Sequence, residues 1–195
     1  MNDAFEKTLR NHTLPAEGGY VHDPADSGGE TFRGISRRNN PSWPGWALID
    51  VAKTKVGVKR LAPYWTTIDE YFKDNDEMFT LVAGVYRTKY WPPVAKMQAP
   101  ERATAKMFDT GVNVGPGQAI KLAQSIIDTA ADGAIGPKTL AAAREYFSQP
   151  GAEKKFLAAY CKVQEQYYRD IVRRKPSQKK FLNGWLRRAA WIPED

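Results

Sequence analysis

Glu17-Gly18-Gly19-Tyr20 begins the most informative stretch of this 195-residue chain. The run that follows is rich in glycine: Asp23-Pro24-Ala25-Asp26-Ser27-Gly28-Gly29-Glu30-Thr31-Phe32-Arg33-Gly34-Ile35-Ser36. Eight residues separate Glu17 from Asp26, and four separate Asp26 from Thr31. Two carboxylates, one at a helix end and one in a neighbouring loop, suit cleavage of a glycosidic bond. One donates a proton, and the other activates water or offsets developing positive charge.

The residues before Glu17 place it near the end of a helix. Residues 3–13 are predicted to be helical because apolar or aromatic side chains recur at helical spacing, in Phe5, Leu9 and His12. The two glycines after Glu17 are helix stop signals. A negative charge at a helix C-terminus is disfavoured by roughly 0.3–1 kcal/mol, which suits a carboxyl group that must hold a proton. The alternative is a solvated glutamate in a turn.

The remaining chain is predicted to be mainly helical. We expect helices over 47–55, 67–90, 100–112, 118–128, 138–147, 153–174 and 177–190, separated by segments that contain proline and glycine. Trp91-Pro92-Pro93 is expected to end the second of these helices. The expected β-structure is a small hairpin-like element near Tyr20 and Thr31. The fold class is therefore mainly α, with a small β-hairpin beside the candidate active site.

Motifs in series along the chain resemble those of glycoside hydrolase family 108, the muramidases of the lysozyme-like group. They are Glu17 to Tyr20 with Asp26 to Ser36, Tyr86 to Trp91, Phe108 to Gly115, and Asp132 to Leu140. The first motif also resembles the Glu-x8-Asp-x5-Thr pattern of phage-type lysozymes, with one residue fewer before the threonine. The last resembles the signature of the family's peptidoglycan-binding half.

The resemblance implies a fold, an activity and a set of roles. It implies a lysozyme-like catalytic lobe over residues 1–92 and a helical lobe with a peptidoglycan-binding-like motif over 93–195. The activity would be that of an N-acetylmuramidase, which cleaves the β-1,4 bond between N-acetylmuramic acid and N-acetylglucosamine in peptidoglycan. Glu17 would be the general acid, Asp26 the second carboxylate, and Thr31 the residue that positions water. By itself, the turn Asp132-Gly133 could be purely conformational.

No cofactor or metal is expected. Asp23, Asp26 and Glu30 lack the spacing of an EF-hand calcium loop. The two histidines, His12 and His22, are too few for a zinc site. The single cysteine, Cys161, excludes an internal disulfide and reads as a buried thiol in a helix.

Aromatic and polar side chains outside the first motif are candidates for substrate binding. Aromatic faces stack on the C–H faces of sugar rings, and polar neighbours bind the hydroxyl groups. The candidates are Tyr20, Trp43, Trp46, Trp91, Asp109 and Asn113. Core packing is the alternative for each tryptophan. Asp109 and Asn113 lie four residues apart on one helix face, where a buried hydrogen bond is an equal alternative.

The basic residues of the chain are concentrated toward its C-terminus. The formal net charge is +7, and eight of the 29 lysines and arginines fall between Arg169 and Arg188, with one acidic residue among them. Such a face attracts polyanions, among them an anionic cell-envelope surface or nucleic acid, or it is simply solvated. No nucleic-acid-binding motif accompanies it.

Two other functions therefore remain to be distinguished from an enzyme. One is a non-catalytic peptidoglycan-binding or secretion-helper protein on the same fold, and the other is a nucleic-acid binder. Retention on peptidoglycan but not on duplex DNA would separate these two.

The sequence also predicts where the protein acts. No run of 18 apolar residues predicts a transmembrane span, and the first residues lack the basic and apolar regions of a signal peptide. We therefore expect synthesis in the cytoplasm and action at the cell wall or periplasm after holin-like or other export. This pattern fits an endolysin in bacteriophage lysis, or a secretion activator.

Overall fold

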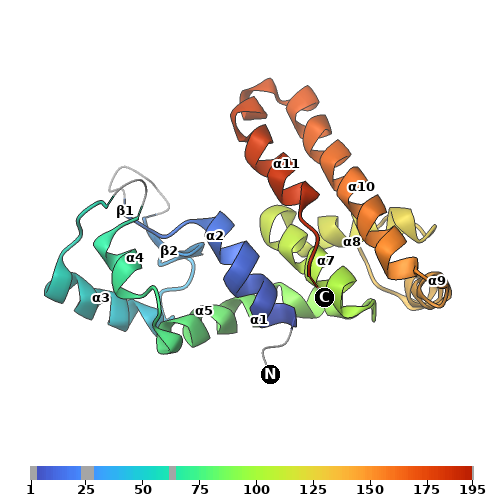
Figure 1. The fold of residues 1–195 in the computed structure, drawn as a ribbon. Coiled ribbons are helices and arrows are strands. Elements are labelled where there is room, and N and C mark those ends of the chain that lie inside the picture. The colour runs from blue at the N-terminus through green and yellow to red at the C-terminus, as the bar shows by residue number, and fades with distance from the viewer. Residues whose placement is uncertain (1–3, 23–28, 62–64, 195) are drawn as a thin grey trace. The chain divides into compact units, whose positions relative to one another are not determined.

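The fold is described from a computed structural model covering residues 4–22, 29–61 and 65–194. The chain forms two compact units (Figure 1). The N-terminal unit is Leu9–Thr88, and the C-terminal unit combines residues 4–8 with residues 89–194. The first helix, α1 (Ala4–Thr8), packs with the C-terminal unit because Phe5 is fully buried there, 5.1 Å from Phe108 between ring centroids. The lobes expected from the sequence, 1–92 and 93–195, place this helix in the first lobe.

The helical segment that leads to Glu17 continues beyond the expected end at residue 13. A π-helical turn, η1 (Leu9–Thr13), is followed by α2 (Leu14–Glu17), with Pro15 in its first turn. Proline lacks the N–H that a regular helix needs, but it is tolerated in the first turn. A break in the backbone hydrogen bonds of the helix is therefore expected just before Pro15. Wide turns of this type are frequent at functional sites.

Three short antiparallel strands follow, in the order β1 (Tyr20–His22), β2 (Glu30–Phe32) and β3 (Ile35–Ser36). Tyr20 pairs with Phe32, and Phe32 pairs with Ile35. Directly paired residues lie on the same face of a sheet, and these three are buried. The sheet therefore turns this face to the core. β1 and β2 form the hairpin expected near Tyr20 and Thr31, and β3 is an additional strand.

Three helices complete the N-terminal unit. They are α3 (Gly45–Val56), α4 (Thr67–Tyr71) and α5 (Asp76–Lys89). The single helix expected over 67–90 is wrong, because two caps divide it. Thr66 and Asp69 form a capping box at the start of α4, and the Asn75 side chain accepts a hydrogen bond from Met78 N–H in the first turn of α5.

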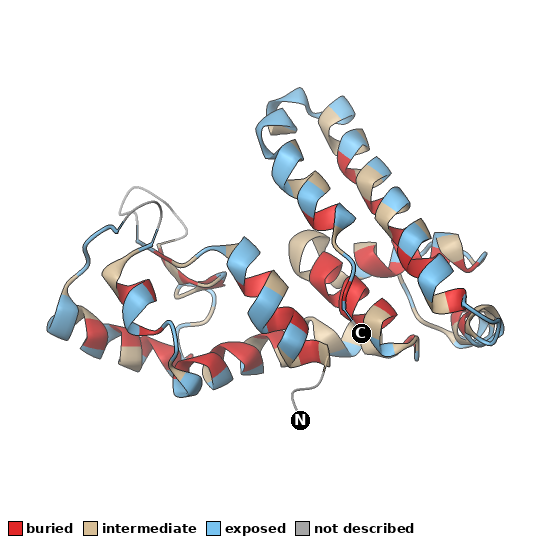
Figure 2. Ribbon diagram, in the orientation of Figure 1, coloured by how far each residue is buried: buried red, intermediate tan, exposed pale blue. Residues whose placement is uncertain are grey.

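The C-terminal unit is a set of packed helices (Figure 1). They are α6 (Trp91–Ala95), α7 (Glu101–Val114), α8 (Pro116–Ile126), α9 (Pro137–Phe147), α10 (Ala152–Arg174), the 3₁₀ turn η2 (Pro176–Phe181) and α11 (Leu182–Ala190). The Trp91-Pro92-Pro93 segment, expected only to end a helix, also begins α6, since proline is tolerated in a first turn. In α7 the nine consecutive residues 103–111 are buried, so this helix is surrounded by protein on all sides, and buried residues also line α8 (Figure 2).

The expected mainly helical, lysozyme-like fold with a small β-element is confirmed. Within the described parts of the chain, no helix combines the length and the apolar character needed to span a membrane.

Candidate active site

Glu17 is the last residue of α2 and is followed by Gly18 with a φ of 79°. Its side chain is half-buried and packs against the turn between β2 and β3. A Cβ atom added to Gly34 in that turn would lie 3.6 Å from Glu17 Oε2. The position at a helix C-terminus agrees with the sequence prediction, and the carboxyl group lies close to this turn.

The turn itself is Arg33-Gly34, with φ values of 44° and 75°. Positive φ at both central residues of a two-residue hairpin loop defines a type I′ turn. The Tyr86 hydroxyl donates to the Arg33 carbonyl at 2.8 Å, and Arg33 N–H donates to the Gly19 carbonyl at 3.1 Å. The turn beside Glu17 is therefore fixed from α5 and from the residue before β1. Tyr86 belongs to a motif noted in the sequence but is not among the predicted site residues.

Asp69 is a second residue that the sequence analysis missed. Its carboxylate is 1% exposed and accepts hydrogen bonds from Thr66 N–H at 2.8 Å and from Tyr20 N–H at 2.7 Å. It thus joins the start of α4 to the start of β1, three residues after Glu17. The capping-box spacing Thr66-x-x-Asp69 is visible in the sequence and could have identified the cap, although not its bond to Tyr20.

Gly19 packs directly against Asp69, which explains the second glycine of the motif. A Cβ atom at Gly19 would overlap the Asp69 carboxylate. We expect Gly19→Ala to lower the free energy of unfolding by about 3 kcal/mol, because either the added methyl overpacks the site or the Asp69 hydrogen bonds break. Thermal or urea unfolding measures the change.

Gly84→Ala is the matched control in the same unit. Gly84 lies in α5, is exposed, and has nothing within 4 Å of an added Cβ. Alanine there should stabilise the protein by about 0.5–1 kcal/mol, because it favours a helix more than glycine does. Equal effects of the two substitutions would contradict the proposed contact.

A pocket of about 410 Å³ opens in the N-terminal unit next to the Glu17 segment. Gly18 and Gly19 line it, whereas the Glu17 side chain is not part of its lining. Its apolar walls are Leu14, Pro15, Trp65 and Phe79. Three basic residues and one acidic residue complete the lining: Arg10, Arg33, Lys73 and Asp69.

The basic residues of the pocket have weak partners. Arg10 lies 3.7 Å from the Phe79 ring centroid and 3.5 Å from the exposed Asp76 carboxylate. Lys73 Nζ lies 4.0 Å from Glu70 Oε1, and both side chains are exposed. Burial lowers the pKa of Arg33, although the nearby Asp69 carboxylate opposes that shift. Since exposed ion pairs of this length contribute little, the pocket carries excess positive charge.

The other two residues predicted to be catalytic are positioned differently. Thr31 lies in β2, half-buried, between the paired residues Val21 and Ser36. Because alternate residues of a strand point to opposite faces, Thr31 is on the face away from the buried Phe32. Asp26 lies outside the described residues. The catalytic roles of Glu17, Asp26 and Thr31 therefore stay predictions.

Tyr20 is 4% exposed, and its hydroxyl donates to Glu30 Oε1 at 2.8 Å. Glu30 also forms ion pairs with Arg37 and Lys53. Burial raises the pKa of Tyr20, and the hydrogen bond to Glu30 adds to that effect. Tyr20 therefore stabilises the buried face of the sheet instead of presenting its ring to substrate.

Among the described residues, no three side chains of the histidine, cysteine, aspartate or glutamate type come together as a metal site.

Trp43 and Trp46 are core residues with 8% and 3% exposure. The Trp43 ring stacks at 6.4 Å from Phe32, and the two indoles meet edge to face at 5.0 Å. Their N–H groups donate to the carbonyls of Leu81 and Asn40. The structure thus favours the packing alternative over a sugar-binding role for both. Trp91 is half-buried and packs edge to face on Phe5 and Phe108 in the C-terminal unit.

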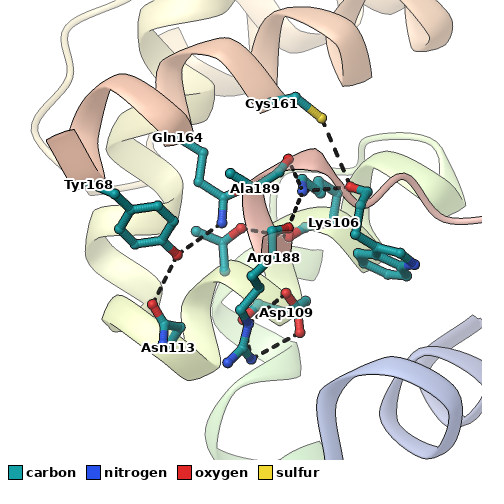
Figure 3. Close-up of polar contacts among 10 residues, drawn as sticks. Lys106, Asp109, Asn113, Cys161, Gln164, Tyr168, Arg188 and Ala189 are labelled. Atoms are coloured by element: carbon teal, nitrogen blue, oxygen red, sulfur yellow. Dashed lines mark hydrogen bonds and ion pairs between the residues drawn. The ribbon is translucent and has the colours of Figure 1, made fainter. Parts of the chain in front are cut away.

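Asp109 and Asn113 lie on one face of α7, as the spacing predicts, but in a buried polar cluster (Figure 3). Asp109 is fully buried, and its two carboxylate oxygens each accept from Arg188 at 2.9 Å. Asn113 Oδ1 accepts from the Tyr168 hydroxyl at 2.9 Å. For Asp109 the structure thus favours the buried hydrogen bond, which joins α7 to α11. Asn113 is half-buried, and its bond joins α7 to α10, so its contact with substrate stays a prediction.

The same cluster contains Lys106, whose buried ammonium donates to the carbonyls of Arg188, Ala189 and Trp191 (Figure 3). These carbonyls lie at the C-terminus of α11, where a cation offsets the helix dipole. Burial lowers the pKa of Lys106 to about 8.

The Asp132 to Leu140 motif forms a loop over residues 132–136 and the first turn of α9, and Gln124 of α8 holds the loop. The buried Gln124 amide donates to Asp132 Oδ1 and the Ala134 carbonyl, both at 2.9 Å, and its oxygen accepts from Gly133 N–H at 2.8 Å. The hydrogen bond from Ala134 N–H lowers the pKa of Asp132 below its usual value, and Gln124 reinforces it. The contacts of Asp132 support the conformational alternative for this turn.

Two family models match this chain, and the boundary between them falls after α7, inside the C-terminal unit. A family model described as Glycosyl hydrolase 108 matches residues 10–115, and one described as Predicted Peptidoglycan domain matches residues 118–190. Among solved structures, the chain is similar to one titled "Structure of Brucella abortus SagA", at 26% identity and a TM-score of 0.59. That similarity covers 95% of this chain and 89% of the other. The comparison with curated proteins gave no match.

Proposed function

Because the chain belongs to the glycosyl hydrolase 108 family, whose model matches more than half of it, we propose that it is an N-acetylmuramidase of the lysozyme type. It is a glycoside hydrolase with a peptidoglycan-binding part, so peptidoglycan is its partner. The bond cleaved in this proposal is the β-1,4 bond from N-acetylmuramic acid to N-acetylglucosamine.

The observation that carries the proposal is the position of Glu17. Its carboxyl group ends α2, is half-buried, and lies against a turn that Tyr86 and the Gly19 carbonyl hold in place. A general acid has to be held within reach of the leaving oxygen, and this arrangement gives it little freedom. Glu17 then protonates the glycosidic oxygen as the bond to the anomeric carbon breaks.

The second carboxylate in the proposal is Asp26. It offsets the positive charge that develops on the sugar ring or activates the water that attacks the anomeric carbon, and Thr31 orients that water. Thr31 lies on the face of the sheet away from the core, which is compatible with a contact to solvent or substrate.

The chemistry of the products tests the proposal. Purified peptidoglycan is digested with the wild-type protein, and the new reducing ends are reduced with borohydride and identified. Muramitol is the expected product, whereas glucosaminitol would assign the other glycosidic bond and contradict a muramidase. Retention on the cell wall without any new reducing end would instead support a binding protein. NMR of the first anomer released would distinguish inversion from retention.

We also propose that the protein acts at the cell wall, and that its C-terminal basic face binds an anionic envelope surface. Arg188 does not belong to this face, since it is buried against Asp109. The other seven basic residues are exposed: Arg169, Arg173, Arg174, Lys175, Lys179, Lys180 and Arg187. Two of them, Arg169 and Arg173, form ion pairs with Glu165 and Asp170. Binding to wall fragments that weakens as salt rises would support this contact.

A further inference from the structure

We infer that the pocket beside the Glu17 segment binds the acidic substituent of the muramic acid ring, and so gives the enzyme its preference for that sugar. The inference rests on the proposed function. It depends on Arg33, Arg10 and Lys73, which line the pocket together with apolar side chains. The expected ligand is a carboxylate carried on a short substituent that also has apolar groups.

Arg33 occupies a backbone position that its residue type disfavours. Type I′ turns favour asparagine or glycine at the first central position, because a β-carbon and a long side chain are strained at positive φ. Arg33 has a φ of 44° in this position. Strain at a non-glycine residue of about 1–3 kcal/mol is often retained for function. An arginine here places a guanidinium at the wall of the pocket, next to the turn that contacts Glu17.

The Arg33 guanidinium has capacity for a ligand. It has five N–H donors. Within the described residues, it donates to the Phe72 carbonyl at 3.4 Å and lies 5.2 Å from the Phe32 ring centroid. Burial removes water from the Arg33 guanidinium, and these weak contacts do not replace the lost hydrogen bonds. Binding of a carboxylate to the guanidinium would therefore be favourable.

The rest of the pocket neutralises this charge only in part. Asp69 is the acidic residue of the lining, and its single negative charge faces three basic residues, which leaves two positive charges in excess. Its carboxylate oxygens already accept hydrogen bonds from Thr66 and Tyr20. Asp76 and Glu70, which face Arg10 and Lys73, are exposed and distant enough to contribute little. An anion would therefore find three cations and no competing free carboxylate among these lining residues.

The apolar walls identify the rest of the ligand. Leu14 and Phe79 are buried, whereas Trp65 is 49% exposed. N-acetylglucosamine carries no ionised group. The muramic ring carries a lactyl ether that ends in a carboxylate, or in a stem peptide with methyl groups and further carboxylates. A cationic pocket with aromatic and aliphatic walls fits this substituent and not the neutral sugar.

The test is binding of three disaccharides that a muramidase cannot cleave. They are GlcNAc-MurNAc with its stem peptide, GlcNAc-MurNAc with a free lactyl carboxylate, and the neutral chitobiose. Binding is followed by NMR or by tryptophan fluorescence. We expect the wild type to bind the acidic ligands roughly tenfold more tightly than chitobiose, with a difference that shrinks at high salt. Tight binding of the free-lactyl ligand alone assigns the lactyl carboxylate, because the stem peptide converts that carboxyl group to an uncharged amide. Tight binding of the peptide ligand alone assigns the peptide carboxylates, and tight binding of both shows that a carboxylate at either position reaches the pocket.

Arg33→Asn separates recognition from folding. Asparagine suits the type I′ turn, so the variant should be at least as stable as the wild type. It should lose roughly tenfold in affinity for the acidic ligands and keep its affinity for chitobiose. Lys73→Met should show a smaller loss of about threefold, since Lys73 is exposed. Lys55→Met, on the exposed surface of α3 outside the pocket, is the control and should change nothing.

Two results would overturn the inference. One is equal affinity of the wild type for all three ligands, and the other is an equal loss for chitobiose in Arg33→Asn. Failure of the proposed function gives a different result. Digestion of whole peptidoglycan would then produce no new reducing end at muramic acid. Binding that depends on charge could then still be observed.

Discussion

Replacing Glu17 with glutamine should lower the rate of release of reducing ends from peptidoglycan by about 10²–10⁴-fold, the usual contribution of general acid catalysis. Glutamine has the shape of glutamate but no proton to transfer to the glycosidic oxygen. The fold should be unaffected, because Glu17 is half-buried at a helix end and glutamine fills the same space. Reducing-sugar release and circular dichroism, measured on the same preparations, test both expectations.

Glu77→Gln provides the matched control for Glu17→Gln. Glu77 lies in the first turn of α5 in the same unit and is exposed. The substitution removes the same charge and should leave activity within about twofold, since surface changes have small effects. Undiminished release of reducing ends by Glu17→Gln would contradict the assignment of Glu17 as the general acid. Similar losses of activity in both variants would indicate a general effect of charge.

Replacing Asp109 with asparagine should destabilise the C-terminal unit by about 3–5 kcal/mol, because it leaves the Arg188 guanidinium buried without its negative partner. Asp109 is fully buried, Arg188 is 7% exposed, and two 2.9 Å hydrogen bonds join them. The pair attaches α11 to α7. Hydrogen exchange of these two helices should therefore accelerate far more than exchange in the N-terminal unit.

Two further variants define the Asp109 result. Asp170→Asn removes an ion pair between Asp170 and Arg173 on the solvent-facing side of α10. It should lower the free energy of unfolding by less than about 1 kcal/mol. The double variant Asp109→Leu with Arg188→Met should recover much of the loss, because apolar residues of similar size often replace a buried pair without penalty. Equal stability of Asp109→Asn and the wild type would show that the pair contributes little.

The sequence predicted those features of the site that are local in the chain. The position of Glu17 near the end of a helix follows from apolar spacing and two glycines, although the predicted helix ended at residue 13. The hairpin follows from the composition of the next run. It did not predict that Tyr86, more than fifty residues away, would hold the Arg33 turn. The Asp69 carboxylate that excludes a side chain at Gly19 is likewise a distant partner. Spacing reports which residues share a face and not what that face contacts.

The residues predicted to bind substrate show the same limit. Asp109 and Asn113 do share a face of α7, but their partners Arg188 and Tyr168 lie 79 and 55 residues further along the chain. Trp43 and Trp46 have the composition of a sugar-binding platform and also that of a core. Only the packing of Phe32 and the two backbone carbonyls around them distinguishes these alternatives.

The assignment of α1 to the C-terminal unit has a consequence for synthesis of the protein. Phe5 is translated before its partner Phe108, which follows about a hundred residues later. At 5–20 residues per second the interval is roughly 5–20 s. The segment Leu9–Thr88 is complete long before that and can fold as the chain emerges. Helix α1 must therefore wait, with its aromatic surface exposed to solvent and to chaperones, until α7 has been made.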